Sequence, residues 1–159
     1  MEFSHLTLLS LFEAQVEKAP EAIALVHGEH SVSYFELDRR ANGLARRLRE
    51  LGVQAEDAAG VALERSAEMV IAALAAWKAG AAYVPLDPSY PVERLSFMLG
   101  DAGVKALFCR EVLGAVLRER HAGLATLDPA EGWPCEAGAA GGRRLHPANL
   151  AYVIYTSGS

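Results

Sequence analysis

Residues 77–99 read WKAGAAYVPLDPSYPVERLSFML, and this stretch decides the fold of the chain. Gly80 ends a helix, because glycine best fits the position after a helix C-terminus. Residues 81–87 then form a short apolar strand. Pro88 and Pro91 fix a turn that restarts a helix, for which Pro91 supplies the first residue. A helix, a strand and a second helix in such close succession are typical of βαβ units and predict a parallel sheet.

The same alternation of strand-like runs and helical periodicity continues on both sides of this stretch. Upstream, Ser66 caps an expected helix over about 67–79, which is apolar nearly all round and therefore packs on more than one side. Another helix opens at Ser33, where Ser33 and Glu36 fit a capping box. The pattern also predicts helices over about 7–18 and 111–119 and strands over 22–26, 31–32, 60–63, 104–108 and 124–127. The predicted fold class is therefore α/β, with a largely parallel sheet and flanking helices.

The composition narrows the classes of function. A formal charge of −5 and a pI near 5.5 argue against a nucleic-acid binder, which normally presents a basic face. The longest apolar run, at 69–77, is far shorter than the roughly 20 residues of a membrane span. Cys109 and Cys135 lack the spacing of metal ligands, so we expect a reduced, cytoplasmic protein. The Gly/Ala/Pro-rich residues 128–144 are predicted to be a surface loop and not a domain boundary.

A second informative stretch is residues 150–159, which read LAYVIYTSGS. Its apolar half predicts a strand, and the run then breaks into Thr156, Ser157, Gly158 and Ser159. Hydroxyl groups, together with a glycine that permits close backbone approach, can surround phosphate oxygens with O–H and N–H donors. An ordinary turn at the end of a strand has the same composition, so the residues alone leave both interpretations open.

The other polar residues have structural explanations. Glu93 and Arg94 stand side by side at the start of a predicted helix, where we expect them to be solvated or paired on the surface. Cys109 follows an apolar run and is predicted to be a small core residue. Asp87 and Asp101 are not predicted to form an acid/base pair. We expect surface or loop positions for the histidines, which have no partner at a diagnostic spacing: His5, His27, His30, His121 and His146.

Three segments carry a resemblance to a known family: SYFEL at 33–37, the stretch at 77–99 and LAYVIYTSGS at 150–159. In this order and at these separations they resemble the first three core motifs of the adenylation domain of nonribosomal peptide synthetases. That domain belongs to the adenylate-forming superfamily, which also includes acyl-CoA synthetases. The resemblance implies the first part of the large N-terminal subdomain of an acyl-CoA synthetase-like fold. It further implies that residues 1–159 are the incomplete N-terminal portion of an AMP-binding adenylation domain.

The resemblance also implies a function. Such a domain uses ATP and Mg²⁺ to activate an amino acid as an aminoacyl-adenylate, and then loads it onto the phosphopantetheine arm of a carrier domain. The implied partners are an amino acid, ATP, and carrier and condensation domains, with no nucleic acid and no membrane. The residues implied to contact the ATP phosphates are Thr156, Ser157, Gly158 and Ser159. The resemblance assigns no catalytic or metal-binding residue within the chain, so the chain alone is expected to be inactive.

Two alternatives stay open at this point. In the first, the chain is a non-catalytic truncated remnant that acts as an interaction module. In the second, it is part of an acyl- or aryl-CoA ligase. Residues 82–91 read AYVPLDPSYP, and this sequence favours the peptide-synthetase branch because it is more typical there than in the CoA ligases.

Overall fold

The structure is a computed structural model, and it describes residues 7–136 and 148–156. At its centre is a four-stranded sheet in the order β4-β3-β5-β6. All neighbouring strands in this sheet are parallel, which confirms the predicted fold class. The strands are β3 (Ala58–Ala62), β4 (Ala82–Pro85), β5 (Val104–Cys109) and β6 (Ala125–Leu127). Every residue of β3 is buried, because this strand lies inside a sheet whose two faces are both covered.

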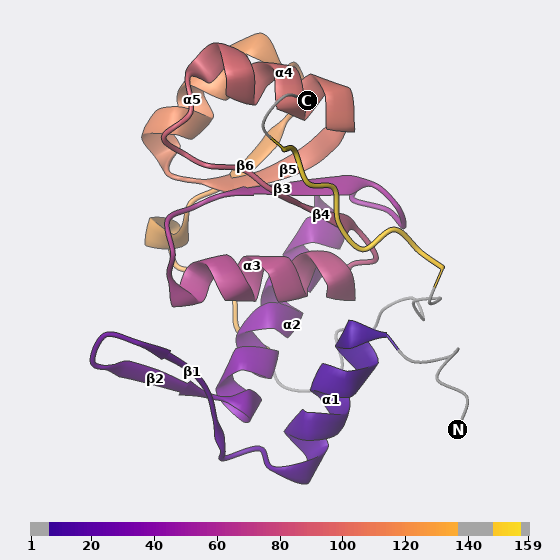
Figure 1. The fold of residues 1–159 in the computed structure, drawn as a ribbon, viewed down its shortest axis with the longest axis vertical. Coiled ribbons are helices and arrows are strands. Elements are labelled where there is room, and N and C mark those ends of the chain that lie inside the picture. Colours follow the sequence, from indigo (N-terminus) through magenta and orange to yellow (C-terminus); the bar gives the residue numbers. More distant parts are fainter. Residues whose placement is uncertain (1–6, 137–147, 157–159) are drawn as a thin grey trace.

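Helices cover both faces of the sheet (Figure 1). On one side lie α1 (Leu8–Lys18), α2 (Tyr34–Glu50) and α3 (Ala67–Lys78), and on the other lie α4 (Val92–Ala102) and α5 (Glu111–Arg120). A short 3-10 helix, η1 (Pro129–Glu131), follows β6. Each face of the sheet has its own core, because successive strand residues, such as Leu107 and Phe108, point to opposite faces. Within the described residues, none of the helices is both long and apolar enough to cross a membrane.

The all-round apolar sequence of α3 is explained by its position. The helix packs against the sheet on one side and against α2 on the other (Figure 1). Its last residue, Lys78, is buried with the apolar side chains. The Lys78 Nζ lies 2.8 Å from Oδ1 of Asp38 on α2 and 3.3 Å from Oε1 of Glu13 on α1. This charged cluster links three helices.

A separate antiparallel hairpin is formed by β1 (Ile23–His27) and β2 (His30–Ser33). Its turn contains Gly28 at a φ of +62°, a left-handed conformation that glycine adopts without steric cost. The hairpin and α1 lie at the end of the molecule away from α4 and α5 (Figure 1).

Two helix starts follow the sequence predictions. The Ser66 hydroxyl accepts a hydrogen bond from the Met69 N–H at 3.3 Å, and the Ser33 hydroxyl accepts one from the Glu36 N–H at 3.1 Å. Both serines are therefore N-caps. The predicted capping box at Ser33 is wrong in its second half, because the Glu36 carboxylate lies 3.9 Å from Arg39 in an ion pair instead.

Part of the surface loop predicted at 128–144 is packed against the core. The Trp133 ring meets the Phe108 ring edge-on, with 5.4 Å between the ring centroids. Farther along, the Glu136 N–H donates a hydrogen bond to a carbonyl of α2 at 3.0 Å. The prediction of a surface loop is confirmed for most of residues 129–136, which are exposed or half-buried, while the Trp133 ring turns inward because an aromatic side chain gains free energy from burial. Residues 137–144 lie outside the described residues.

Candidate functional site

The carboxyl ends of the parallel strands carry a groove that is lined by both charged and apolar residues. A hollow of about 430 Å³ lies between the ends of β3 and β4, at Arg65 and Asp87. An adjoining hollow of about 410 Å³ extends it to Arg110 at the end of β5. The strand order reverses here, since the chain adds β4 on one side of β3 and β5 on the other. In open α/β sheets, ligands bind outside the carboxyl ends of the strands at such a reversal.

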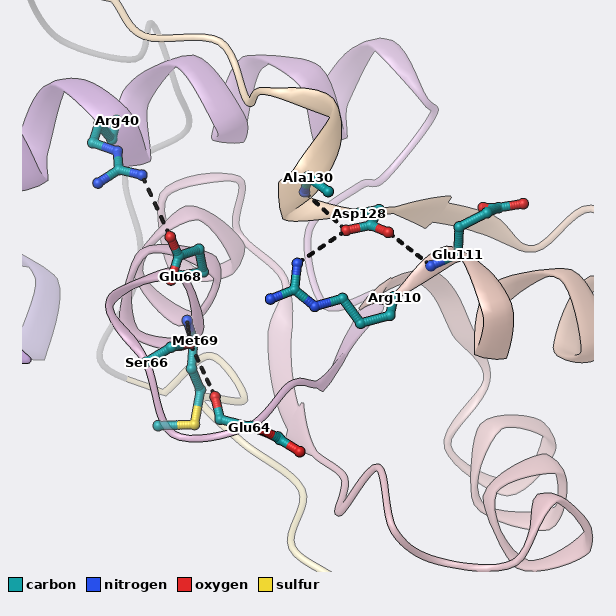
Figure 2. A network of polar contacts seen from close by, with 9 residues as sticks. All are labelled: Arg40, Glu64, Ser66, Glu68, Met69, Arg110, Glu111, Asp128 and Ala130. Carbon is teal, nitrogen blue, oxygen red and sulfur yellow. Dashed lines mark hydrogen bonds and ion pairs between the residues drawn. The ribbon is translucent and has the colours of Figure 1, made fainter.

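Asp128, which follows β6, forms polar contacts that hold the β5–β6 side of this groove in place (Figure 2). Its carboxylate accepts hydrogen bonds from the backbone N–H groups of Ala130 and Glu111, both at 2.8 Å. It also forms an ion pair with Arg110 at 3.3 Å. These contacts, with the Ala130 bond first, hold the pKa of Asp128 below its ordinary value. Asp128 therefore fixes the ends of β5 and β6 relative to each other.

The variant Asp128→Asn is expected to make the fold less sensitive to acid. A carboxyl whose pKa is lowered by folding stabilises the protein above its unfolded pKa of about 3.9, and this contribution is lost as the pH falls through the lower folded pKa. From about pH 5 downward, the free energy of unfolding should therefore fall more steeply for the wild type than for the variant. Urea unfolding at a series of pH values measures both slopes. Equal slopes would contradict the role assigned to Asp128.

On the other side of the groove, the residues that follow β3 are held by the N-cap of α3 and by an ion pair (Figure 2). The Ser66 hydroxyl donates a hydrogen bond to the backbone carbonyl of Glu64 at 2.9 Å. Glu68, in the first turn of α3, lies 4.0 Å from Arg40 on α2. The groove presents charges of both signs, from Glu64, Arg65, Glu68 and Arg110.

A tight turn carries the chain from β4 into α4. Oδ1 of Asp87 accepts hydrogen bonds from the Ser89 hydroxyl at 2.7 Å and from the Ser89 N–H at 2.9 Å. These bonds, with the hydroxyl first, hold the pKa of Asp87 below its ordinary value. The prediction of Pro91 as the first residue of the helix is wrong by one position, because its ψ of 143° is extended and makes it the N-cap. Glu93 and Arg94 then lie on the surface, as predicted. Glu93 forms an ion pair with Arg120, and the Arg94 guanidinium stacks over the Tyr90 ring.

The terminal segment, residues 150–156, lies beside β4. The Tyr83 N–H donates a hydrogen bond to the Ala151 carbonyl, and the Val153 N–H donates one to the Tyr83 carbonyl, both at 2.9 Å. The indole N–H of Trp77 donates a further bond to the Ala151 carbonyl at 2.7 Å. The strand predicted here is reduced to a single parallel bridge, because these bonds hold the segment to β4 over only a few residues.

Tyr155 is anchored on α4. Its hydroxyl donates a hydrogen bond to Oδ2 of Asp101 at 2.7 Å and lies 3.3 Å from the Met98 carbonyl oxygen. Burial, followed by the bond to Asp101 and by the charge of that carboxylate, raises the pKa of Tyr155 to about 12. Asp101 accepts from a tyrosine while Asp87 accepts within its own turn, so the two carboxylates have separate partners.

Thr156 is the predicted phosphate-binding residue that falls within the described part of the chain, and it is exposed. Ser157, Gly158 and Ser159 lie outside the described residues, so a phosphate contact of this loop stays a prediction. Sequence reasoning missed the hydrogen bond between Asp101 and Tyr155, because these two residues are separated by 54 positions in the chain.

The remaining candidates have structural positions. Within residues 7–136 and 148–156, no group of three or more His, Cys, Asp or Glu side chains could hold a metal ion. Cys109 is buried in the core, as predicted, and burial raises the pKa of its thiol to about 12. His121 lies at the end of α5, where its Nε2 is 2.8 Å from the Ser96 hydroxyl. This hydrogen bond joins α5 to α4.

Known proteins resemble this chain in family, sequence and structure. A family model described as AMP-binding enzyme matches residues 12–159. The chain is 43% identical over 158 residues to tyrocidine synthase 3 of Brevibacillus parabrevis, covering 96% of the chain and 2% of that relative. It is 46% identical over 162 residues to malpinin synthetase of Mortierella alpina, covering 98% of the chain and 2% of that relative.

Solved structures show the same likeness. A variant of the nonribosomal peptide synthetase FmoA3, in its α-methyl-L-serine-AMP-bound form, is 31% identical, with a TM-score of 0.80 over 98% of this chain. The AMPPNP-bound form is 30% identical, with a TM-score of 0.78 over 99% of this chain. This chain spans 18% and 17% of the length of those two structures, respectively.

Proposed function

Because the chain belongs to the AMP-binding enzyme family, we propose that it is part of an enzyme that uses ATP to activate an amino acid. The amino-acid carboxylate attacks the α-phosphorus of ATP, a new P–O bond forms, and pyrophosphate leaves. The acyl group of the resulting aminoacyl-adenylate then passes to the phosphopantetheine thiol of a carrier domain. The observation that carries this proposal is the family match over residues 12–159, which includes both the turn after β4 and the segment beside it.

Residues Thr156 to Ser159 are proposed to hold the ATP phosphates. Thr156 fits this role because it is exposed and offers a hydroxyl donor directly after a segment that β4 holds in place. When bound, ATP supplies the phosphorus that the carboxylate attacks, and Mg²⁺ offsets the charge on the phosphates. The contribution of the described residues is to direct the chain toward this loop.

Residues 1–159 are proposed to be the first portion of an adenylation domain in a cytoplasmic, multidomain synthetase. The small share of each relative that this chain spans, between 2% and 18%, supports this proposal. Carrier and condensation domains are the partners that follow from it. The relatives named as peptide synthases favour this assignment over a CoA ligase.

ATP–pyrophosphate exchange in the presence of each amino acid tests the proposal. We expect exchange with one or a few amino acids from the longest polypeptide that the same gene encodes, and no exchange from the 159-residue chain alone. Turnover by the short chain would contradict the assignment of the remaining machinery to other residues. Transfer of a fatty or aryl acid to coenzyme A by the longer polypeptide would support the CoA ligase instead. A stop codon directly after Ser159 would support the non-catalytic remnant.

A further inference from the structure

The hydroxyl of Tyr155 joins the terminal segment to the far end of α4. We propose that the hydrogen bond between Tyr155 and Asp101 is a positioning contact that fixes Thr156, the first residue of the proposed phosphate loop. This inference rests on the function proposed for that loop. It assigns a role to a helix residue that lies outside the loop, 54 positions earlier in the chain.

The backbone bonds to β4 fix the segment before Tyr155. They act on Ala151 and Val153, through Tyr83 and Trp77. Tyr155 adds a side-chain anchor two residues nearer to the loop. Thr156 is joined directly to this anchor, so the position of the tyrosine ring limits where Thr156 can lie.

Because side chains alternate between two faces along the segment, the Tyr155 anchor decides on which face Thr156 lies. Val153 and Tyr155 are half-buried and pack against the core on the α4 side, whereas Tyr152 and Ile154 are 54% and 58% exposed on the other face. Thr156 belongs to the exposed face, because successive residues of an extended chain point to opposite sides. A slip of one residue would exchange the two faces and turn Thr156 toward the core. The bond to Asp101 opposes that slip.

The chemistry of the contact suits a permanent anchor. A hydroxyl that donates to a carboxylate forms a charge-assisted hydrogen bond, which is short and strong, and the distance here is 2.7 Å. The carbonyl of Met98 lies within reach as a second acceptor at 3.3 Å. With its pKa raised to about 12, the Tyr155 hydroxyl keeps its proton even in alkaline solution in which an ordinary tyrosine, with a pKa of about 10, ionises.

Steady-state kinetics of the longest polypeptide that the gene encodes test the positioning role. Tyr155→Phe removes the hydroxyl and should raise the KM for ATP by about tenfold, while the KM for the amino acid changes by less than about twofold. Asp101→Leu should have the same effect. Asp101→Asn keeps an oxygen acceptor and should recover most of the ATP affinity. The matched control is Tyr152→Phe, which removes a hydroxyl from the exposed face of the same segment and should leave both KM values unchanged.

A spectroscopic titration of the 159-residue chain tests the contact without activity. Ionised tyrosine absorbs in the near ultraviolet, and Tyr155→Phe should remove the group that titrates near pH 12. Asp101→Asn should lower that pKa, because it removes the carboxylate charge. A Tyr155 titration that is unchanged in Asp101→Asn would overturn the contact.

The outcomes separate this inference from the proposed function. If the unaltered polypeptide shows no exchange with any amino acid, the proposed function fails, and the positioning role fails with it. If it does exchange, and Tyr155→Phe leaves the KM for ATP unchanged or raises both KM values equally, only the positioning role is overturned. The positioning role is also overturned if Tyr152→Phe raises the KM for ATP as much as Tyr155→Phe does.

Discussion

Replacing Lys78 with methionine is expected to lower the free energy of unfolding by about 3 kcal/mol. The Lys78 side chain is 3% exposed, and its Nζ lies 2.8 Å from Asp38, a carboxylate that is itself only 20% exposed. Methionine keeps most of the apolar packing but removes the charge, so the Asp38 carboxylate is left without its main partner. An uncompensated charge of this kind costs about 3–5 kcal/mol, and the partial exposure of Asp38 places the effect at the lower end.

Two further variants isolate the cause of the Lys78 effect. Glu13→Gln removes the second partner, but Glu13 is 52% exposed, so this change should cost less than about 1 kcal/mol. The double variant Lys78→Met with Asp38→Asn removes both charges and should be more stable than Lys78→Met alone. Chemical denaturation of the wild type and these variants measures the differences. A double variant that is less stable than Lys78→Met would show that lost packing, and not the stranded carboxylate, causes the destabilisation.

The second large effect is expected from Gly43→Ala in the middle of α2. A Cβ atom at Gly43 would lie 2.4 Å from the carbonyl oxygen of Pro134 and 2.8 Å from the backbone nitrogen of Cys135. These are backbone atoms, so the segment that carries Trp133 would have to shift. Overpacking of this kind costs up to about 3 kcal/mol. Alanine's better helix propensity offsets about 1 kcal/mol, which leaves a net loss of about 2 kcal/mol.

Gly100→Ala is the matched control for Gly43→Ala, because Gly100 also lies in a helix. The nearest atom to an added Cβ there is Cε1 of His121, at an ordinary contact distance of 3.7 Å. This change should therefore stabilise the protein, by up to about 1 kcal/mol. Thermal or urea unfolding compares the two variants, and Trp133 fluorescence reports on the shifted segment. A Gly43→Ala variant as stable as Gly100→Ala would show that residues 132–136 do not press on α2.

The local signals in the sequence were sufficient for the helices and for the strands up to β6, but not for the strand predicted at residues 150–155, which is a single bridge. Ser66 caps α3 and Gly80 follows its end with a φ of +84°, because capping depends on residues within one helical turn. The same signals were less reliable where a longer-range contact competes. The Glu36 carboxylate pairs with an arginine instead of completing the predicted capping box, and Trp133, within the predicted surface loop, packs its ring on Phe108.

The candidate site was predictable only in part. The residues at 150–159 and their resemblance to a phosphate loop were evident from the order of residue types. The groove at the carboxyl ends of the strands was not, because it depends on which strands become neighbours. Asp128 and Asp101 were not identified for the same reason: the groups that they bind lie on other elements.

By itself, the sequence determined the alternation of strands and helices, and with it a parallel sheet and the resemblance to an adenylating family. Periodicity, capping and turn residues are local properties, so no tertiary information was needed. Only the tertiary structure decided the strand order β4-β3-β5-β6, which places a reversal and a groove beside Arg65 and Arg110. It also decided the partners of Lys78 and Tyr155. These contacts join residues far apart in the chain, and they form only when packing brings the helices and the sheet together.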